Sequence, residues 1–112
     1  MAISAINEDR WGAMSLIEQM ANIGSEVGRT RKWMEKGKLQ MAEGAFERGL
    51  DLLDATIKLG RGNLDSRSGL LKELCRAREL FASSFLENDI ESLAYLDRYF
   101  GQFATALRRT CL

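Results

Sequence analysis

Residues 15–34 read SLIEQMANIGSEVGRTRKWM and have the pattern of one long amphipathic helix. The helix is predicted to begin with a capping box, in which the Ser15 and Glu18 side chains satisfy each other's free backbone amides. Its apolar side chains recur at spacings of three, four and seven residues, which places them on one face. They are Leu16, Met20, Ile23, Val27 and Met34. Cationic residues precede Gly37 and complement the partial negative charge of a helix C-terminus, so we predict that the helix ends there.

Two further segments repeat this spacing in the middle of the chain. The second predicted helix covers residues 38–59, and Gly60 and Gly62 mark its end because glycine accepts the left-handed cap conformation. The core stripe of this helix consists of Leu39, Ala42, Phe46, Leu50, Leu53 and Ile57. The third predicted helix begins near Ser66 or Ser68.

The last predicted helix completes the architecture. It follows a cap within residues 88–91 and ends near Arg108 and Arg109. The connections are short, so successive helices should be antiparallel neighbours. We therefore predict an all-α fold, in which residues 15–112 form a single-domain, antiparallel up-down-up-down four-helix bundle. The apolar residues within 1–14 fit either a short extra helix packed on the bundle or a frayed N-terminal arm.

The composition excludes several classes of mechanism. The chain has 112 residues, with 16 basic and 16 acidic side chains and a formal net charge of zero. It has no proline, which favours long uninterrupted helices. It also has no histidine, so no imidazole can act as a base, an acid or a metal ligand. A di-metal carboxylate site would need Glu-x-x-His pairs. We therefore predict no enzymatic activity, no cofactor and no metal site.

The sequence pattern points to the cytoplasm. The start of the chain has no basic segment followed by an apolar run, which a secretory signal would need. No stretch approaches 18 apolar residues, so we predict no contact with a membrane. Cys75 and Cys111 lie far apart and are predicted to be free thiols in a reducing compartment. Zero net charge makes nucleic acid an improbable general partner, because such binders usually carry a basic excess.

Small residues and a second apolar line predict a contact between subunits. A glycine inside a helix costs about 1 kcal/mol relative to alanine, and close approach of another helix is the usual reason for it. The second helix has apolar residues away from its core stripe, and a soluble monomer normally avoids such an exposed patch. The candidate homodimer contacts are Met41, Leu52, Leu59, Trp33, Gly24 and Gly28. The competing interpretations are tight packing within one bundle and a broad core covered by residues 1–14.

The cationic side chains give two further sets of candidates. Arg78 falls inside the apolar stripe of the third helix on a helical wheel, and a buried guanidinium without a partner costs several kcal/mol. We therefore predict a buried ion pair with Asp97 or Asp54, with an anion-binding arginine in a bundle cavity as the alternative. The candidate contacts to an anion or a nucleic acid are Arg29, Arg31, Lys32 and Arg76.

Four segments carry a resemblance to known proteins. They are SLIEQMANIGSEVGR (15–29), AFERGLDLLDATI (45–57), ELCRAREL (73–80) and YFGQFATALR (99–108). The segments resemble a family of small uncharacterised prokaryotic helical-bundle proteins, and this resemblance implies no activity. The architecture is more distantly similar to HEPN-type helical bundles, which partner small nucleotidyltransferases or RNases in toxin–antitoxin pairs. The RNase members use an arginine followed closely by a histidine, whereas Arg76 and Arg78 have no histidine after them.

These observations lead to two hypotheses about function. The leading one is a non-enzymatic cytoplasmic helical-bundle protein that acts through protein–protein contacts as a homodimer. The alternative is a nucleotide- or RNA-binding accessory module of the HEPN/nucleotidyltransferase-partner kind. That module would use Arg29, Arg31, Lys32, Arg76 and Arg78.

Overall fold

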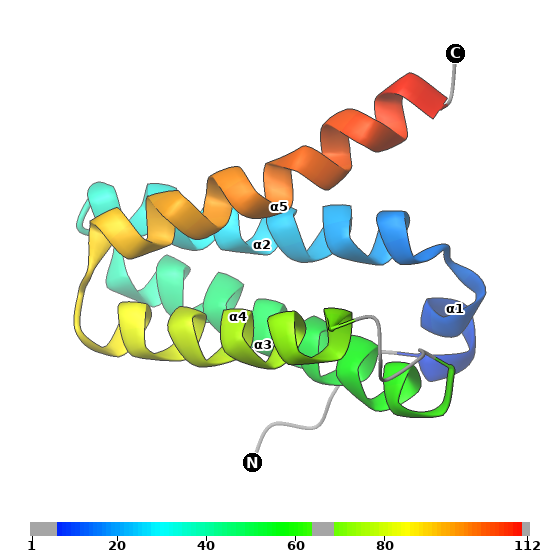
Figure 1. The fold of residues 1–112 in the computed structure, drawn as a ribbon. Coiled ribbons are helices and arrows are strands. Elements are labelled where there is room, and N and C mark those ends of the chain that lie inside the picture. The colour runs from blue at the N-terminus through cyan, green and yellow to red at the C-terminus, as the bar shows by residue number, and fades with distance from the viewer. Residues whose placement is uncertain (1–6, 64–68, 111–112) are drawn as a thin grey trace.

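A computed structural model describes residues 7–63 and 69–110 of the chain, and this part consists of helices and the turns that connect them, with no strand. The helices are α1 (Glu8–Ala13), α2 (Leu16–Glu35), α3 (Leu39–Asn63), α4 (Leu70–Leu86) and α5 (Ile90–Thr110), as Figure 1 shows. The predicted all-α class is therefore confirmed. Within the described ranges, no helix combines the length and the apolar character needed to cross a membrane.

The residues at both ends of α2 form the caps that the sequence predicts. The Ser15 hydroxyl accepts a hydrogen bond from the Glu18 amide at 3.1 Å, and the Glu18 carboxylate accepts one from the Ser15 amide at 3.0 Å. After Glu35 the chain reverses through Gly37, whose φ of +72° suits a residue without a Cβ. The predicted start and end of this helix are thus confirmed.

Another predicted boundary is wrong. The third helix of the structure, α3, does not end at Leu59 but continues through Gly60 and Gly62 to Asn63. Glycine permits a helix to end but does not force it to end. The helix continues where its backbone hydrogen bonds stabilise the chain by more than the conformational entropy that glycine loses in a helix. Helix α4 begins only at Leu70, after Gly69 at a φ of +78°. The predicted start near Ser66 or Ser68 lies outside the described residues.

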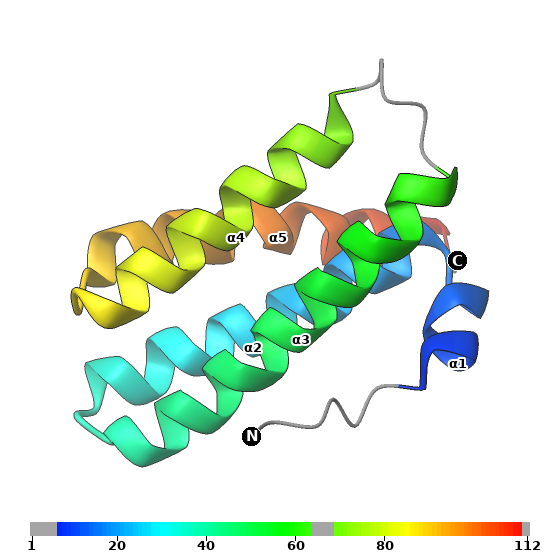
Figure 2. The same ribbon diagram turned by 90° about the horizontal axis from the view of Figure 1, so that it is seen from below.

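The four long helices lie in two layers, α2 beside α5 and α3 beside α4 (Figures 1 and 2). Helix α2 packs extensively on α3 and α5, whereas α4 makes sparser contacts with α3 and α5. The centre of the core is fully buried and takes side chains from all four helices. It includes Met20, Ile23, Val27, Leu53, Leu74, Phe81, Leu93 and Phe100. The turns α2–α3 and α4–α5 lie at one end of the molecule, and α1 lies at the other.

Helix α1 resolves the two interpretations of the N-terminal segment in favour of a short packed helix. The buried indole of Trp11 donates a hydrogen bond to Thr56 Oγ1 of α3 at 2.9 Å. The Thr56 hydroxyl donates to Gln19 Oε1 at 3.0 Å, and Gln19 Nε2 donates back to the Trp11 carbonyl at 2.9 Å. This closed set of bonds joins α1, α2 and α3. The first six residues lie outside the described part of the chain.

Gly24 and Gly28 serve the contact between α2 and α5. A Cβ on Gly24 would lie 2.8 Å from Phe100 Cβ, and one on Gly28 would lie 3.1 Å from Asp97 Oδ1. The backbone of α5 therefore approaches α2 closely at Gly24, and the Asp97 side chain of α5 fills the space beside Gly28. The assignment of Gly24 and Gly28 to a homodimer contact is wrong, because α5 of the same chain occupies the space beside them.

Candidate functional site

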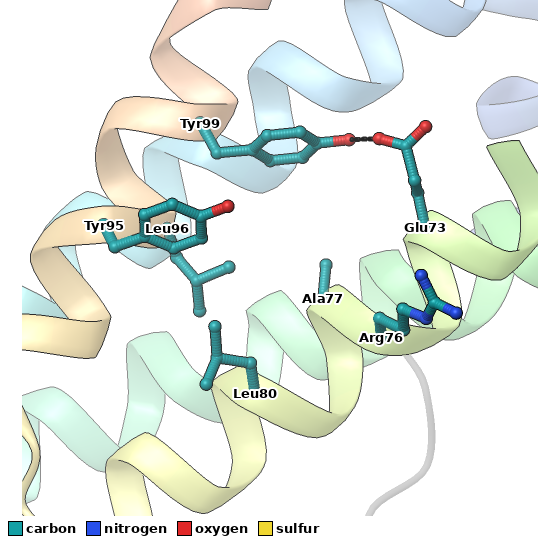
Figure 3. A pocket seen from close by; sticks show the side chains of 7 residues that line it. All are labelled: Glu73, Arg76, Ala77, Leu80, Tyr95, Leu96 and Tyr99. Carbon is teal, nitrogen blue, oxygen red and sulfur yellow. Dashed lines mark hydrogen bonds between the residues drawn. The ribbon is translucent and has the colours of Figure 1, made fainter.

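A pocket of about 250 Å³ lies between α4 and α5, where the helices pack sparsely (Figure 3). Helix α4 contributes Glu73, Arg76, Ala77 and Leu80, and α5 contributes Tyr95, Leu96 and Tyr99. The side chains differ in character along the pocket. Leu80, Leu96 and Ala77 form an apolar surface, whereas Glu73 and Arg76 stand together on the α4 side (Figure 3).

A hydrogen bond across the pocket joins the two helices. The Tyr99 hydroxyl donates to Glu73 Oε1 at 3.0 Å. Burial, together with the hydrogen bond to the Glu73 carboxylate and the charge of that carboxylate, raises the pKa of Tyr99 to about 12. The phenol therefore keeps its proton at neutral pH and holds it towards Glu73. The ring makes edge contacts with Phe100 and Phe103, at centroid distances of 5.0 and 5.7 Å.

Arg76 and Tyr95 lie at opposite ends of the pocket (Figure 3). Tyr95 is 55% exposed, and its ring stands beside Leu96 with the hydroxyl towards the pocket (Figure 3). Arg76 is exposed, and among the described residues no hydrogen bond or ion pair to its guanidinium is found. The pocket thus combines an apolar surface with a cation that has no partner in the described part of the chain.

The sequence prediction for Arg78 needs correction. Its partner is Asp54 of α3, which accepts from the Nε and Nη2 groups of Arg78, the latter at 3.3 Å. The pair is not buried, because the side chains are 38% and 52% exposed. A long arginine can start in an apolar stripe and still place its guanidinium at the surface. Asp97 instead binds Arg31, whose Nε and Nη2 both lie 2.9 Å from Asp97 Oδ2.

The four candidate anion contacts do not converge on one place. Arg29 pairs with Glu26 at 3.3 Å, and Arg31 pairs with Glu35 at 3.1 Å as well as with Asp97. Arg29 and Lys32 line a polar hollow of about 300 Å³ between α2 and α5. The other residues that line it are Gly24, Ser25, Gly28 and Asp97. Arg76 lies instead at the separate pocket between α4 and α5.

The candidate homodimer residues on α3 divide into covered and exposed positions. Leu59 is partly buried and faces α1, since a Cβ on Gly12 would lie 3.6 Å from Leu59 Cδ1. Leu52 is also partly buried against the core. Both residues belong to a broad core, and the cover over Leu59 comes from the N-terminal segment. Met41 is 52% exposed, as the homodimer hypothesis requires.

Trp33 and Met41 lie side by side near the α2–α3 turn. Arg48 of α3 donates to Glu26 Oε2 of α2 at 3.2 Å, which fixes the register of the two helices. Trp33 is seven residues after Glu26, and Met41 is seven residues before Arg48, so each lies two turns further towards the turn. Trp33 is half-buried, with the ammonium groups of Lys36 and Lys38 5.3 and 5.8 Å from the centroid of its ring.

Two leucines extend this apolar region at the same end of the molecule. Leu86 is 77% exposed at the end of α4, and Leu39 is 62% exposed at the start of α3. The stacked rings of Phe46 and Phe85, with centroids 4.1 Å apart, hold α3 and α4 together near these leucines. The sequence pattern wrongly places Leu39 in the core stripe. We define the turn-end surface as Trp33, Leu39, Met41 and Leu86.

Charged residues of opposite sign flank the turn-end surface. The basic group lies at the α2–α3 turn and consists of Lys32, Lys36 and Lys38. The acidic group lies at the α4–α5 turn and consists of Glu87, Asp89 and Glu91. All six side chains belong to exposed residues. This end of the molecule therefore carries exposed apolar side chains together with two turns of opposite charge.

Cys75 is half-buried and free, while Cys111 lies outside the described residues. Among the residues that the structure describes, no group of three or more cysteine, aspartate or glutamate side chains could hold a metal ion. Comparison of the chain with protein-family models, curated proteins and solved structures returned no match.

Proposed function

We propose that this chain is a non-enzymatic protein that acts through protein–protein contacts and forms a homodimer through its turn-end surface. The observation that carries the proposal is the exposure of large apolar side chains at the end of the molecule that has two turns of opposite charge. The cytoplasmic location that belongs to this proposal rests on the sequence pattern alone. We further infer that α2–α5 form an up-down-up-down bundle, since successive helices pack together and α2 also packs on α5.

The apolar side chains supply the driving force for association. Five large hydrophobic side chains are exposed among the described residues, and Leu39, Met41 and Leu86 are three of them. Soluble monomers rarely expose contiguous apolar patches of several hundred Å², and burial of apolar area contributes about 25 cal/mol per Å². Leucine and methionine side chains at the centre of a contact would thus favour association, provided that the surrounding charges match.

The charges favour a second copy of the chain as the occupant. In a two-fold symmetric contact, each residue of one surface meets the corresponding surface of its partner. The basic α2–α3 turn of one copy can then face the acidic α4–α5 turn of the other, in two equivalent places. Such complementarity directs association and fixes the orientation of the partners. A formal net charge of zero also leaves little long-range repulsion between copies.

Light scattering coupled to size-exclusion chromatography tests the proposal. The full chain should change from monomer to dimer within the micromolar range, and Leu86→Lys should shift the midpoint to a concentration at least about tenfold higher. Ile17→Lys is the matched control, because Ile17 is 36% exposed on the first turn of α2, at the opposite end. Ile17→Lys should leave the midpoint unchanged.

Charge reversal tests the orientation of the two copies. Lys38→Glu and Glu87→Lys should each weaken the dimer, and the double variant should recover most of the loss, because the reversed charges still face each other. The proposal is wrong if the chain stays monomeric up to high micromolar concentration. It is also wrong if Ile17→Lys weakens association as much as Leu86→Lys.

The nucleotide- or RNA-binding alternative has less support from the arrangement of the cations. Arg29 and Arg31 are already paired with carboxylates, and Arg78 is paired with Asp54. Lys32 and Arg76 lie in different hollows, one between α2 and α5 and one between α4 and α5. A polyanion would therefore meet scattered single cations, whereas affinity for phosphate backbones grows with the number of cations that contact them.

A further inference from the structure

The methionines of the described residues differ sharply in their access to solvent. Met41 is 52% exposed, whereas Met20 is fully buried and Met34 is 7% exposed. Met14 is half-buried against the core, and its sulfur accepts a weak hydrogen bond from Asn22 Nδ2 at 3.8 Å. A dissolved oxidant must reach the sulfur of a thioether before it can react there. Among these four thioethers, that of Met41 is therefore the most accessible to oxidation.

The position of Met41 decides what its oxidation would change. Met41 belongs to the turn-end surface, together with the exposed Leu39 and Leu86 and the half-buried Trp33. Oxidation converts the flexible apolar thioether of methionine into a polar sulfoxide, which disrupts apolar contacts. A sulfoxide within such a contact would lose the water that solvates its oxygen, and this loss costs free energy. Oxidation of Met41 therefore opposes association through this surface.

We propose that Met41 is a peroxide-sensitive modification site and that its sulfoxide weakens the homodimer. The weakening of the homodimer rests on the proposed function, whereas the selectivity for Met41 rests on exposure alone. In the reaction, a lone pair of the Met41 sulfur attacks one oxygen of hydrogen peroxide. The S–O bond forms while the O–O bond breaks, and the other oxygen leaves as water with both protons. The sulfur is oxidised by two electrons, and the peroxide is reduced by two.

The monomer is the form that reacts. A contact between two copies through the turn-end surface covers Met41, so association should protect its sulfur from peroxide. Oxidised monomers associate less tightly, and the equilibrium moves away from the dimer by mass action. Met41 should therefore oxidise more slowly above the midpoint concentration of the monomer–dimer equilibrium than below it.

Mass spectrometry of tryptic peptides tests the selectivity. The full chain carries Cys75→Ser and Cys111→Ser, because thiols compete for peroxide, and is kept well below the dimer midpoint. Residues 39–48 then report Met41 as their only methionine, and residues 33–36 report Met34. Met41 should oxidise at least about tenfold faster than Met34 and Met20 in the folded chain. In concentrated urea the three rates should become similar, because unfolding exposes every sulfur.

Light scattering coupled to size-exclusion chromatography tests the effect on association. Oxidation of Met41 should raise the midpoint concentration at least about tenfold, and methionine sulfoxide reductases with dithiothreitol should restore it. Met41→Leu has no thioether at this position, so its own midpoint should be the same before and after peroxide. Met34→Leu is the matched control, because Met34 is buried and leucine conserves its volume. Its midpoint should rise with peroxide as that of the parent chain does.

Two kinds of result would overturn the proposal. One is oxidation of Met20 or Met34 as fast as that of Met41 in the folded monomer. The other is a midpoint that does not change when Met41 is oxidised, or that changes equally in Met41→Leu. A chain that stays monomeric with and without peroxide contradicts the proposed function and, with it, the weakening of the homodimer. The peptide rates still decide in that case whether Met41 is the preferred site of oxidation.

Discussion

Alanine at Gly24 and alanine at Gly101 should change stability in opposite directions, although both glycines lie inside long helices. Each substitution gains helix propensity of about 1 kcal/mol. At Gly101 nothing else changes, because a Cβ there would meet no heavy atom of the neighbouring elements within 4 Å. Gly101→Ala should therefore stabilise the protein by about 0.5–1 kcal/mol.

At Gly24 the new methyl group has no room. It would lie 2.8 Å from Phe100 Cβ and 3.4 Å from the Phe100 carbonyl carbon, whereas carbon atoms pack best at about 3.5–4.0 Å. Neither atom is the far end of a flexible side chain, so α5 itself must move. Overpacking of this kind costs about 1–3 kcal/mol, which exceeds the gain in propensity. We expect a net loss of about 1 kcal/mol, and at most about 2 kcal/mol.

Urea unfolding followed by far-ultraviolet circular dichroism measures both variants under the same conditions. A midpoint that falls for Gly24→Ala and rises for Gly101→Ala, at equal slopes, supports the close approach of α2 and α5. A rise for both variants would refute it, because Gly24 would then face open space. If Gly24 lay at a subunit contact instead, its substitution would lower the dimer fraction and leave the unfolding of dilute monomer unchanged.

Two further predictions concern hydrogen bonds. Thr56→Val should lower the free energy of unfolding in urea by about 1–3 kcal/mol, because it leaves the Trp11 indole and the Gln19 carbonyl unpaired in the interior. The control is Thr105→Val on the surface, which should change the free energy of unfolding by no more than about 0.5 kcal/mol. Tyr99 should titrate near pH 12. A pKa raised in the folded state means that its contribution to stability is complete below about pH 10 and is lost as the pH rises towards about 12. Absorbance at 295 nm should show a late step that Tyr99→Phe removes, and persistence of that step would contradict the assignment.

Local signals in the sequence were sufficient wherever neighbouring residues decide the outcome. The capping box at Ser15 and the left-handed Gly37 depend on contacts within three residues, and the structure has both. The continuation of α3 through Gly60 was not predictable in this way, because glycine is compatible with either outcome. Leu39 shows the same limit for burial, since its place in the stripe does not reveal that none of the described helices covers the start of α3.

Pairings between distant residues required the register of the helices, which a single helical wheel does not contain. The wheel placed Arg78 in an apolar stripe and offered Asp54 and Asp97 as equal partners. The structure selects Asp54, and it gives Asp97 to Arg31, 66 residues away in the chain. The bond between Tyr99 and Glu73 was missed altogether. A tyrosine beside the core stripe of α5 was its only signal, and such a residue has many possible partners.

The contrast between the two faces of α5 explains why α5 packs closely on α2 but leaves a pocket towards α4. Towards α2, α5 meets Gly24 and Gly28, which have no side chains to hold the backbones apart. Towards α4, it presents Tyr95 and Tyr99, and the distance between packed helices grows with the size of the side chains between them. The rings thus separate α4 from α5, while the Tyr99 hydroxyl spans the gap to Glu73. Small residues therefore allow α5 to pack closely on α2, and aromatic residues hold α5 away from α4. The pocket between α4 and α5 results from this packing arrangement.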